Sequence, residues 1–543
     1  MMADNFSLSE LCFLAALAVA GAVVIGELLS RYTTHRIKVD VPVVGVGVRY
    51  TYWLAALRNV QHARESIVEG YRKANFAFQI PTMTRMEVFI CDRKMTREYQ
   101  NVDENHLSVR AVFCQEFQFD FLLPGNSIRP DMIPSSVIAK GLSWQKTRAA
   151  KLDDSFFKAF SAELFYGFRA EMQMLAENQH KPSTESANAS DPVSDTSAHS
   201  KWLAAPCFPF CLKIIARLTI FSLFGESLCR DVAFLDLCCD FGNALPIDAL
   251  LLRSLPSWAK PLVLRYLTTT RRLGELQEII RAEIDKRRNS GEKAPMKVRD
   301  ILDYTMDWID NRRDTMFGDA HVVHVMIRVI FAALHTSSQV CFFLVAHTLF
   351  ELATRPDYIG ALREEVEQCF EQHGQGTKAA LDSMYKIDSF IKETQRFNPL
   401  DAASLARVAL KEFTFSNGLH IPKGSVIFTP NSPIFEDERF YPKAKTFDGF
   451  RFSRMRGDPK LKSSCDLTAT NEQSMHFGTG RHACPGRFMV SDEVKLAVIF
   501  NLQNFDIAME NFGPRPKNHA FGKFMLPDMA AKIWLRESTT GKE

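Results

Sequence analysis

The sequence lacks the cysteine spacing and the charge bias that mark several protein classes. Its 543 residues include 12 cysteines, none in a paired Cys-x-x-Cys framework, which argues against a secreted disulfide scaffold. Lys and Arg number 66 against 63 Asp and Glu, a net charge of +3, so no nucleic-acid partner is expected. No Gly-x-Gly-x-x-Gly follows a predicted strand, so an embedded flavin or nicotinamide domain is not expected either.

Tyrosine and tryptophan are scarce, with 11 and 6 residues, whereas phenylalanine is abundant, with 43. Such purely apolar rings fill a large core or line an apolar cavity. Hydrophobic residues make up 46% and charged residues 24%, which is ordinary for a globular chain. A wholly disordered, collagen-like or multi-pass membrane protein is therefore excluded.

A charge-poor apolar run near the N-terminus predicts a membrane anchor. Residues 11–29 are apolar apart from Glu27 and reach the length of about twenty residues that spans a bilayer. Acidic Asp4 and Glu10 precede the run and Arg31 follows it, which places the bulk of the chain in the cytosol. A cleaved signal peptide is the alternative, but it would need a basic leading segment. We expect a lumenal tail over 1–10, a transmembrane anchor over 11–29, a linker over 30–50 and one large domain over 51–543.

Two Asn-x-Ser sequons and one polar insert belong to this outline. Asn5 would lie in the lumen and is a glycosylation candidate, whereas Asn188 would stay unmodified on the cytosolic side. Asn188 falls in residues 177–201, which are rich in Ser, Thr, Asn, Asp and Pro. This composition predicts a disordered surface loop inserted into the domain.

Helical patterns dominate the rest, so the predicted class is mainly α with small β sheets. Residues 319–354 contain neither Pro nor Gly, end before Pro356, and predict one long central helix that is apolar nearly all round. Polar residues at intervals argue against a second membrane span. Further helices are expected over 357–370 and 383–397, and strands over 86–91 and within 413–428.

The segment 477–487, FGTGRHACPGR, carries the strongest local signal. Its glycines permit a tight turn, and Pro485 suits the first position of a helix that continues over 488–500. Cys484 would therefore sit at a loop-to-helix junction, where backbone N–H groups lower a thiol pKa and keep a thiolate. Gly486 would leave room for a flat ring against the helix.

This segment resembles the haem-binding signature of cytochromes P450, Phe-x-x-Gly-x-x-x-Cys-x-Gly. Phe477, Gly480, Cys484 and Gly486 occupy its four defined positions, a match expected about 0.002 times by chance at this composition. The resemblance implies haem b, with Cys484 as the axial ligand of the iron. A zinc site built on Cys484 and His482 is a weaker alternative, because two ligands do not complete it.

Other stretches resemble the family in order and distance. Glu393 and Arg396 match Glu-x-x-Arg, and the resemblance adds Arg451 to a buried structural network. Residues 331–338 resemble the oxygen-binding stretch of the family's central helix, with Ala332 and Ala333 in the small positions. In the absence of the resemblance, these small residues would indicate close helix packing equally well.

The distal residues implied by the resemblance are Thr336 and His335. The hydroxyl of Thr336 would hold a water where protons are delivered to oxygen. His335 replaces the usual acid; it could relay protons, or it could face solvent or a backbone carbonyl.

Haem propionates need cations, and the resemblance suggests several. His482 takes the place of a usual arginine, and Arg407 follows on a predicted strand. Trp144 and Arg148 fit the family's Trp-x-x-x-Arg, although a competing alignment of residues 137–143 offers Lys140 instead. Surface charges are the alternative for this pair.

The resemblance implies a membrane-bound haem-thiolate monooxygenase of fungal type in the endoplasmic reticulum, using O2. Electrons would come from NADPH–cytochrome P450 reductase, with cytochrome b5 as an optional second donor, and Arg481 and Arg487 are candidates for docking. The substrate would be a hydrophobic secondary metabolite: a terpenoid, indole-terpenoid or polyketide. A haem-thiolate isomerase or dehydratase, and a non-catalytic membrane haem protein, stay open as alternatives. The expected substrate-lining residues are Phe331, Ala332, Ala333 and Ala403, together with residues 121–128, 402–405 and 521–524.

Overall fold

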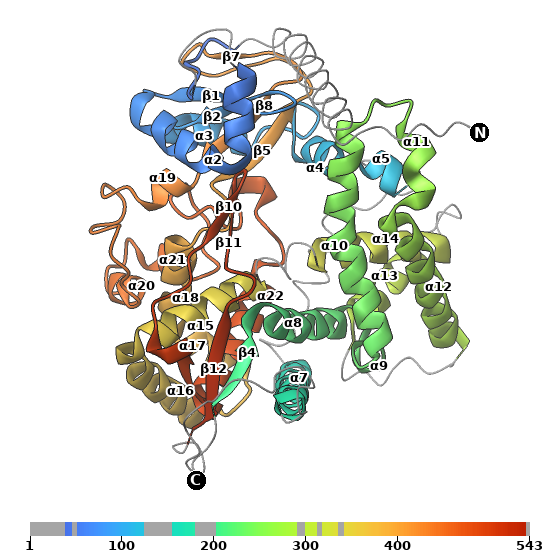
Figure 1. Ribbon diagram of the computed structural model, residues 1–543, viewed down its shortest axis with the longest axis vertical. Helices are drawn as coiled ribbons and strands as arrows, with labels where there is room; N and C mark the ends of the chain where they lie inside the picture. The colour runs from blue at the N-terminus through green and yellow to red at the C-terminus, as the bar shows by residue number, and fades with distance from the viewer. Residues whose placement is uncertain are drawn as a thin grey trace, which may run out of the picture.

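The computed structural model describes residues 39–45, 52–123, 155–179, 202–289, 299–311, 318–334 and 341–538. The predicted anchor, both sequons, Trp144, Arg148, Lys140, His335 and Thr336 lie outside these ranges. Within them the protein is mainly helical with small sheets (Figure 1), as the sequence predicts.

The largest sheet has five strands in the order β1-β2-β8-β5-β3. These are β1 (Ala77–Pro81), β2 (Met86–Ile90), β8 (Val426–Pro430), β5 (Ala403–Ala409) and β3 (Leu107–Ser108). β2 pairs with β8 in parallel, and the other neighbours are antiparallel. Every residue of β1 and β8 is buried, because α2 (Tyr52–Lys73) covers this sheet, as Figure 1 shows at the upper left.

Smaller strand groups complete the β structure. β4 (Leu203–Pro206), β12 (Lys532–Glu537) and β9 (Phe505–Met509) form a three-stranded sheet. β6 (Phe413–Thr414) pairs with β7 (His420–Ile421), and β10 (His519–Phe521) pairs with β11 (Phe524–Leu526). Strands expected over 86–91 and within 413–428 are therefore present.

Helices surround one extensive apolar core. α3 (Arg93–Gln100) contacts the cysteine loop and α22 (Arg487–Asn504) follows it. α8 (Cys207–Phe224) and α18 (Tyr385–Phe397) are two further helices. Besides these, α2 and the two parts of the central helix, the described helices of eight residues or more are α4 (Val109–Phe117), α7 (Ser155–Gln179), α10 (Val232–Ser254), α12 (Thr268–Asn289), α13 (Ile301–Asp310) and α16 (Ile359–His373).

The predicted central helix begins and ends where the sequence indicates, but it is not one uniform α-helix. α14 (Asp319–Phe331) and α15 (Phe343–Thr354) are its two α-helical parts. Residues 332–334 and 341–342, on either side of the undescribed centre, form wider π-helical turns. Such turns often occur at functional sites, because they displace side chains from the regular helical face.

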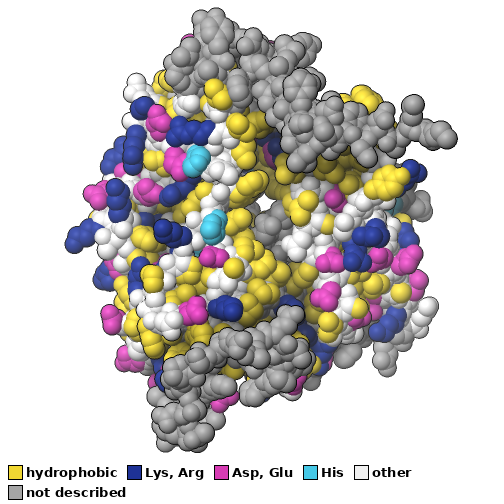
Figure 2. Space-filling model, viewed as in Figure 1, with side chains coloured by type: hydrophobic (Ala, Val, Ile, Leu, Met, Phe, Trp, Pro, Cys, Tyr) yellow, Lys and Arg dark blue, Asp and Glu magenta, His cyan; other side chains and the backbone are white. Residues whose placement is uncertain are grey.

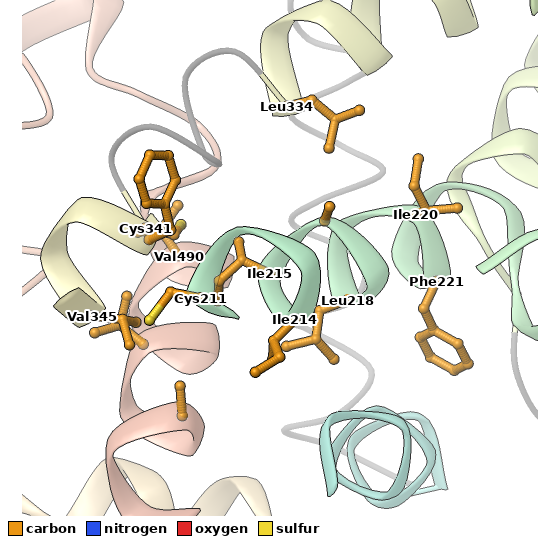
Figure 3. Packing of buried hydrophobic residues seen from close by; sticks show 14 of the residues in the cluster. Cys211, Ile214, Ile215, Leu218, Ile220, Phe221, Leu334, Cys341, Val345 and Val490 are labelled. Carbon is orange, nitrogen blue, oxygen red and sulfur yellow. The ribbon is translucent and has the colours of Figure 1, made fainter. Parts of the chain in front are cut away.

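α8 is the one helix in the described ranges that is long and apolar enough to cross a membrane, and 72% of that stretch is buried in the protein. Figure 3 shows its Ile214, Ile215 and Leu218 within the packed interior, with Cys341 and Val490 close by. An apolar helix enclosed in this way belongs to the core.

Two sequence-based boundaries are wrong. Residues 177–179 belong to the end of α7 rather than to the predicted loop insert, because the helix continues through Glu177. Pro485 is not the first residue of a helix: Gly486 is the N-cap and α22 begins at Arg487. The proline fixes the backbone one step earlier, in the loop.

Candidate functional site

The loop before α22 is a tight turn that needs two of its glycines. Gly478 and Gly480 have φ values of +67° and +69°, which residues other than glycine rarely adopt. A Cβ on Gly480 would also lie 2.8 Å from Asn101 Oδ1, so α3 and the turn approach each other closely. The Cys484 N–H donates to the Phe477 carbonyl at 2.8 Å and closes the loop.

Cys484 lies at the edge of the core. The residue packs against the central apolar cluster and is half-buried. Burial raises the pKa of this thiol, while backbone N–H groups of Gly486 and Arg487 act in the opposite direction. The junction thus supplies the N–H groups that the sequence predicts, and burial of the thiol acts against them.

Arg487 supports the loop from within. Its Nη1 donates to the Cys484 carbonyl at 2.6 Å and its Nε to the Thr468 carbonyl at 3.2 Å. Its guanidinium is thus engaged in holding the loop, which makes Arg487 a poor docking residue. The Arg481 N–H donates to Asn101 Oδ1 at 3.1 Å while the residue itself is exposed, so Arg481 still suits contact with a partner.

Arg407 and His482 lie near each other beside the loop, and only the arginine is a permanent cation. Arg407 is only 2% exposed, and its Nε has no hydrogen-bond partner among the described residues. Burial lowers the pKa of His482, and the charge of Arg407 lowers it further, so the two side chains are close. Glu104 Oε2 lies 3.5 Å from His482 Nε2. No sequence motif points to this carboxylate.

A β-bulge in β5 directs Arg407 to this place. The pairing of β5 with β8 shifts register between Ser404 and Arg407, and Leu405 takes a left-handed φ of +53°. The Leu405 side chain lies close to Gly478 of the cysteine loop. The bulge reverses the alternation of the strand: Leu405 and Ala409 pack in one apolar cluster and Ala403 in another, although all three positions are odd-numbered.

The predicted structural network is formed. Arg396 donates to the Glu393 carboxylate at 2.8 and 2.7 Å, and Arg451 Nε does so at 3.1 Å. All three side chains are at least nine-tenths buried. The arginines also donate to the carbonyls of Phe435 and Pro442, each at 2.6 Å, so the network joins α18 to the chain that leads to the cysteine loop.

The central helix leaves open space just after α14, in the segment that resembles the family's oxygen-binding stretch. Ala332 is exposed and Ala333 half-buried, although α14 around them is buried. Phe331 is 5% exposed and meets Phe117 and Phe119 edge to face, at centroid distances of 5.0 and 5.5 Å. Figure 2 shows the surface hollowed near the middle of this view, with hydrophobic side chains around the opening.

The other expected lining residues divide into two groups. Ala403, the first residue of β5, is 2% exposed and lies in an apolar cluster of the large sheet, so it borders open space less than Ala332 does. Phe521 and Phe524, at the turn between β10 and β11, are about half exposed.

These residues fit a thiolate-bound haem. A half-buried cysteine offers a soft ligand for iron. A buried guanidinium without a carboxylate partner is costly, and a propionate would supply the missing negative charge. Uncovered alanines in a buried helix provide room for the ring and its ligand. No group of three or more metal-binding side chains occurs in the part of the chain described here, so nothing there favours the zinc alternative.

Comparisons with known proteins agree with this chemistry. The Cytochrome P450 family model matches residues 88–534. Cytochrome P450 monooxygenase ltmQ of Epichloe festucae var. lolii is 63% identical, over 99% of this chain and 98% of its own length. Relatives named terQ of Tolypocladium album and paxQ of Penicillium paxilli are 59% and 38% identical, over 96% and 94% of this chain and 93% and 94% of their own lengths. The cysteine loop and these likenesses lead to one conclusion: the chain belongs to the cytochrome P450 family and is a monooxygenase.

Proposed function

We propose that the protein is a membrane-anchored, haem b-dependent monooxygenase that oxidises a hydrophobic small molecule in fungal secondary metabolism. It takes electrons from NADPH–cytochrome P450 reductase, with cytochrome b5 as an optional second donor. The observation that carries the proposal is the half-buried Cys484 just before α22, in the same loop region as the buried Arg407, whose Nε has no hydrogen-bond partner among the described residues.

Each residue of the site has a role in this proposal. Bound haem supplies the oxygen-activating redox chemistry. Cys484 ligates the iron, and Arg407 and His482 hold the propionates. Ala332 and Ala333 leave space above the ring, while Thr336 holds a water and His335 passes protons toward it.

The substrate class follows from apolar surroundings and from the relatives. Phe331 and its ring contacts form an apolar wall. The relatives are named as monooxygenases of fungi. A terpenoid, an indole-terpenoid or a polyketide suits such a site.

An exposed apolar surface supports seating on the endoplasmic reticulum membrane. Trp258, Leu262 and Tyr266, in and around α11 (Lys260–Val263), are each at least 65% exposed. Ile247 and Leu250 at the end of α10 are more than half exposed. Apolar side chains gathered in this way bind lipid readily. They complement the proposed anchor at 11–29, with 1–10 lumenal, 30–50 as linker and 51–543 as the cytosolic catalytic domain.

The decisive experiment is expression in microsomes, followed by a carbon monoxide difference spectrum of the reduced protein. We expect a thiolate-type maximum, and then NADPH- and O2-dependent oxidation of one member of a terpenoid, indole-terpenoid and polyketide panel. Full turnover without NADPH or O2 would instead identify the isomerase or dehydratase. Pigment without turnover of any panel member would favour the non-catalytic alternative.

Thr336→Ala tests the distal role in the same preparation. The variant should consume NADPH at a similar rate but release more peroxide and less product, because the water that Thr336 is proposed to hold is lost. An unchanged ratio of product to NADPH would remove Thr336 from the mechanism.

A further inference from the structure

A buried carboxyl and a buried thiol meet beside the cysteine loop, and neither is used by the site described above. Glu493 lies in the second turn of α22, and Cys341 lies just before α15; both are 0% exposed. Cys341 Sγ donates to Glu493 Oε2 at 3.3 Å. The two residues are 152 positions apart, so this contact exists only in the folded protein.

Glu493 has no cation opposite it among the described residues. Its neighbour Asp492 has one, since Lys378 Nζ lies 2.7 Å from Asp492 Oδ1. Glu493 Oε1 lacks a hydrogen-bond partner, and the Thr219 hydroxyl of α8 lies beside the carboxyl without normal hydrogen-bond geometry. A buried carboxylate in such surroundings is costly, so the neutral form is favoured.

The electrostatic surroundings also favour the neutral, protonated form of Glu493. Burial raises the pKa of Glu493 to about 8, and the charge of Asp492 adds to this effect. The Cys341 hydrogen bond acts in the opposite direction. Cys341 and Asp492 are the titratable groups whose charge or hydrogen bond acts on this carboxyl in the described part of the chain. Near neutral pH the pair therefore carries no net charge.

The pair adjoins both halves of the haem site. Cys341 is close enough to Cys484 for the charge of that thiolate to raise the pKa of the Cys341 thiol. Figure 3 shows Cys341 next to Val490, one turn before Glu493 on α22. Cys341 also comes five residues after Thr336, so the contact joins the central helix to the helix that follows the iron ligand.

We propose that Glu493 and Cys341 are positioning residues that act on the Cys484 thiolate. As a neutral, hydrogen-bonded pair they keep negative charge away from that thiolate, and ionisation of Glu493 lowers the reduction potential of the bound iron. This inference rests on the haem-thiolate site proposed above.

The test uses the full-length holoenzyme and measures the midpoint reduction potential from about pH 6.5 to about pH 9. In the wild type, the potential should fall as the pH passes through about 8, because a new negative charge disfavours the reduced iron. Glu493→Gln should remove this inflection and retain the potential of the low-pH form. Cys341→Ala should move the inflection to higher pH, because the hydrogen bond that favours the ionised form is lost.

Glu367→Gln, on the exposed face of α16, is the matched control and should behave as the wild type. An inflection kept in Glu493→Gln, or absent from the wild type, would overturn the inference while the thiolate-type carbonyl spectrum stays intact. If Glu493→Gln does not retain haem, the Cys341→Ala variant provides the test. An inflection of its reduction potential at the same pH as in the wild type would then contradict the proposed role of the pair. Loss of the thiolate-type spectrum in the wild type would overturn the proposed function and this inference together.

Discussion

Arg451 Nε lies 3.1 Å from Glu393 Oε2, across 58 residues of sequence. Glu393 is completely buried and receives both Arg396 and Arg451, so one carboxylate fixes two arginines that also bind carbonyls of the chain before the cysteine loop.

Removing Arg451 should therefore destabilise the fold. Arg451→Ala leaves Glu393 with one cation and removes the hydrogen bonds that Arg451 donates to the Pro442 and Thr446 carbonyls. Breaking a buried ion pair costs about 3–5 kcal/mol. Chemical denaturation should show the lower free energy of unfolding, and the absorbance of the purified protein should show a reduced haem content. Arg454→Ala is the control: Arg454 is 62% exposed and pairs with Asp448 at the surface, so about 1 kcal/mol or less is expected. Equal stability of the two variants would contradict the role of the network.

Cys484→Ser should abolish the thiolate-type spectrum and the oxidation, while the circular dichroism spectrum stays unchanged. The replacement keeps the N–H that binds the Phe477 carbonyl but offers a hydroxyl in place of the sulfur that iron requires. Cys239→Ser, at a half-buried cysteine of α10, separates this effect from loss of a thiol in general and should keep the spectrum. A thiolate spectrum retained in Cys484→Ser would refute the ligand assignment.

Arg407→Met should weaken haem retention while destabilising the haem-free chain little. The guanidinium donates to the Ala406 and Gln100 carbonyls, but it is buried and forms no salt bridge among the described residues, so the loss of these hydrogen bonds is offset by the removal of a buried charge. Loss of a charged hydrogen bond to a propionate is worth about 1.5–3 kcal/mol, which corresponds to tenfold or more in haem dissociation. Lys411→Met, two residues beyond β5 and exposed, is the control. A lowered melting temperature of haem-free Arg407→Met would show that Arg407 mainly supports the fold.

Acid should destabilise the protein through His476. Its ring stacks on Phe435 at a centroid distance of 4.2 Å, and burial, with the charges of Lys392 and Arg396, lowers its pKa to about 3. Between about pH 6.5 and pH 3 the unfolded chain binds a proton that the folded chain does not. The free energy of unfolding therefore falls with decreasing pH, by at most about 1.4 kcal/mol per pH unit from this group. His476→Phe should make this dependence shallower, and an identical pH profile would contradict the assignment.

The sequence predicts the local parts of the site well. Glu393 and Arg396 are three residues apart on one helix, so their pairing follows from helical spacing. The glycines of the cysteine loop likewise predict a turn before α22. The ends of the central helix are also correct, because breakers mark them.

What the sequence does not reveal depends on tertiary contacts. Glu104 lies beside His482 although the two residues are far apart in the sequence. The burial that raises the pKa of Cys484 likewise depends on the packing of the whole core. The meeting of Cys341 and Glu493 has no local signature either. A pattern over a few residues carries no information on such distances.

The left-handed Leu405 also makes the length of β5 critical. Because that single residue exchanges the two faces of the strand, deleting or inserting one amino acid beside it would turn the guanidinium of Arg407 away and present Ala406 or Val408 to the cysteine loop. Conservative side-chain replacements are thus better tolerated at this edge of the sheet than any change in spacing.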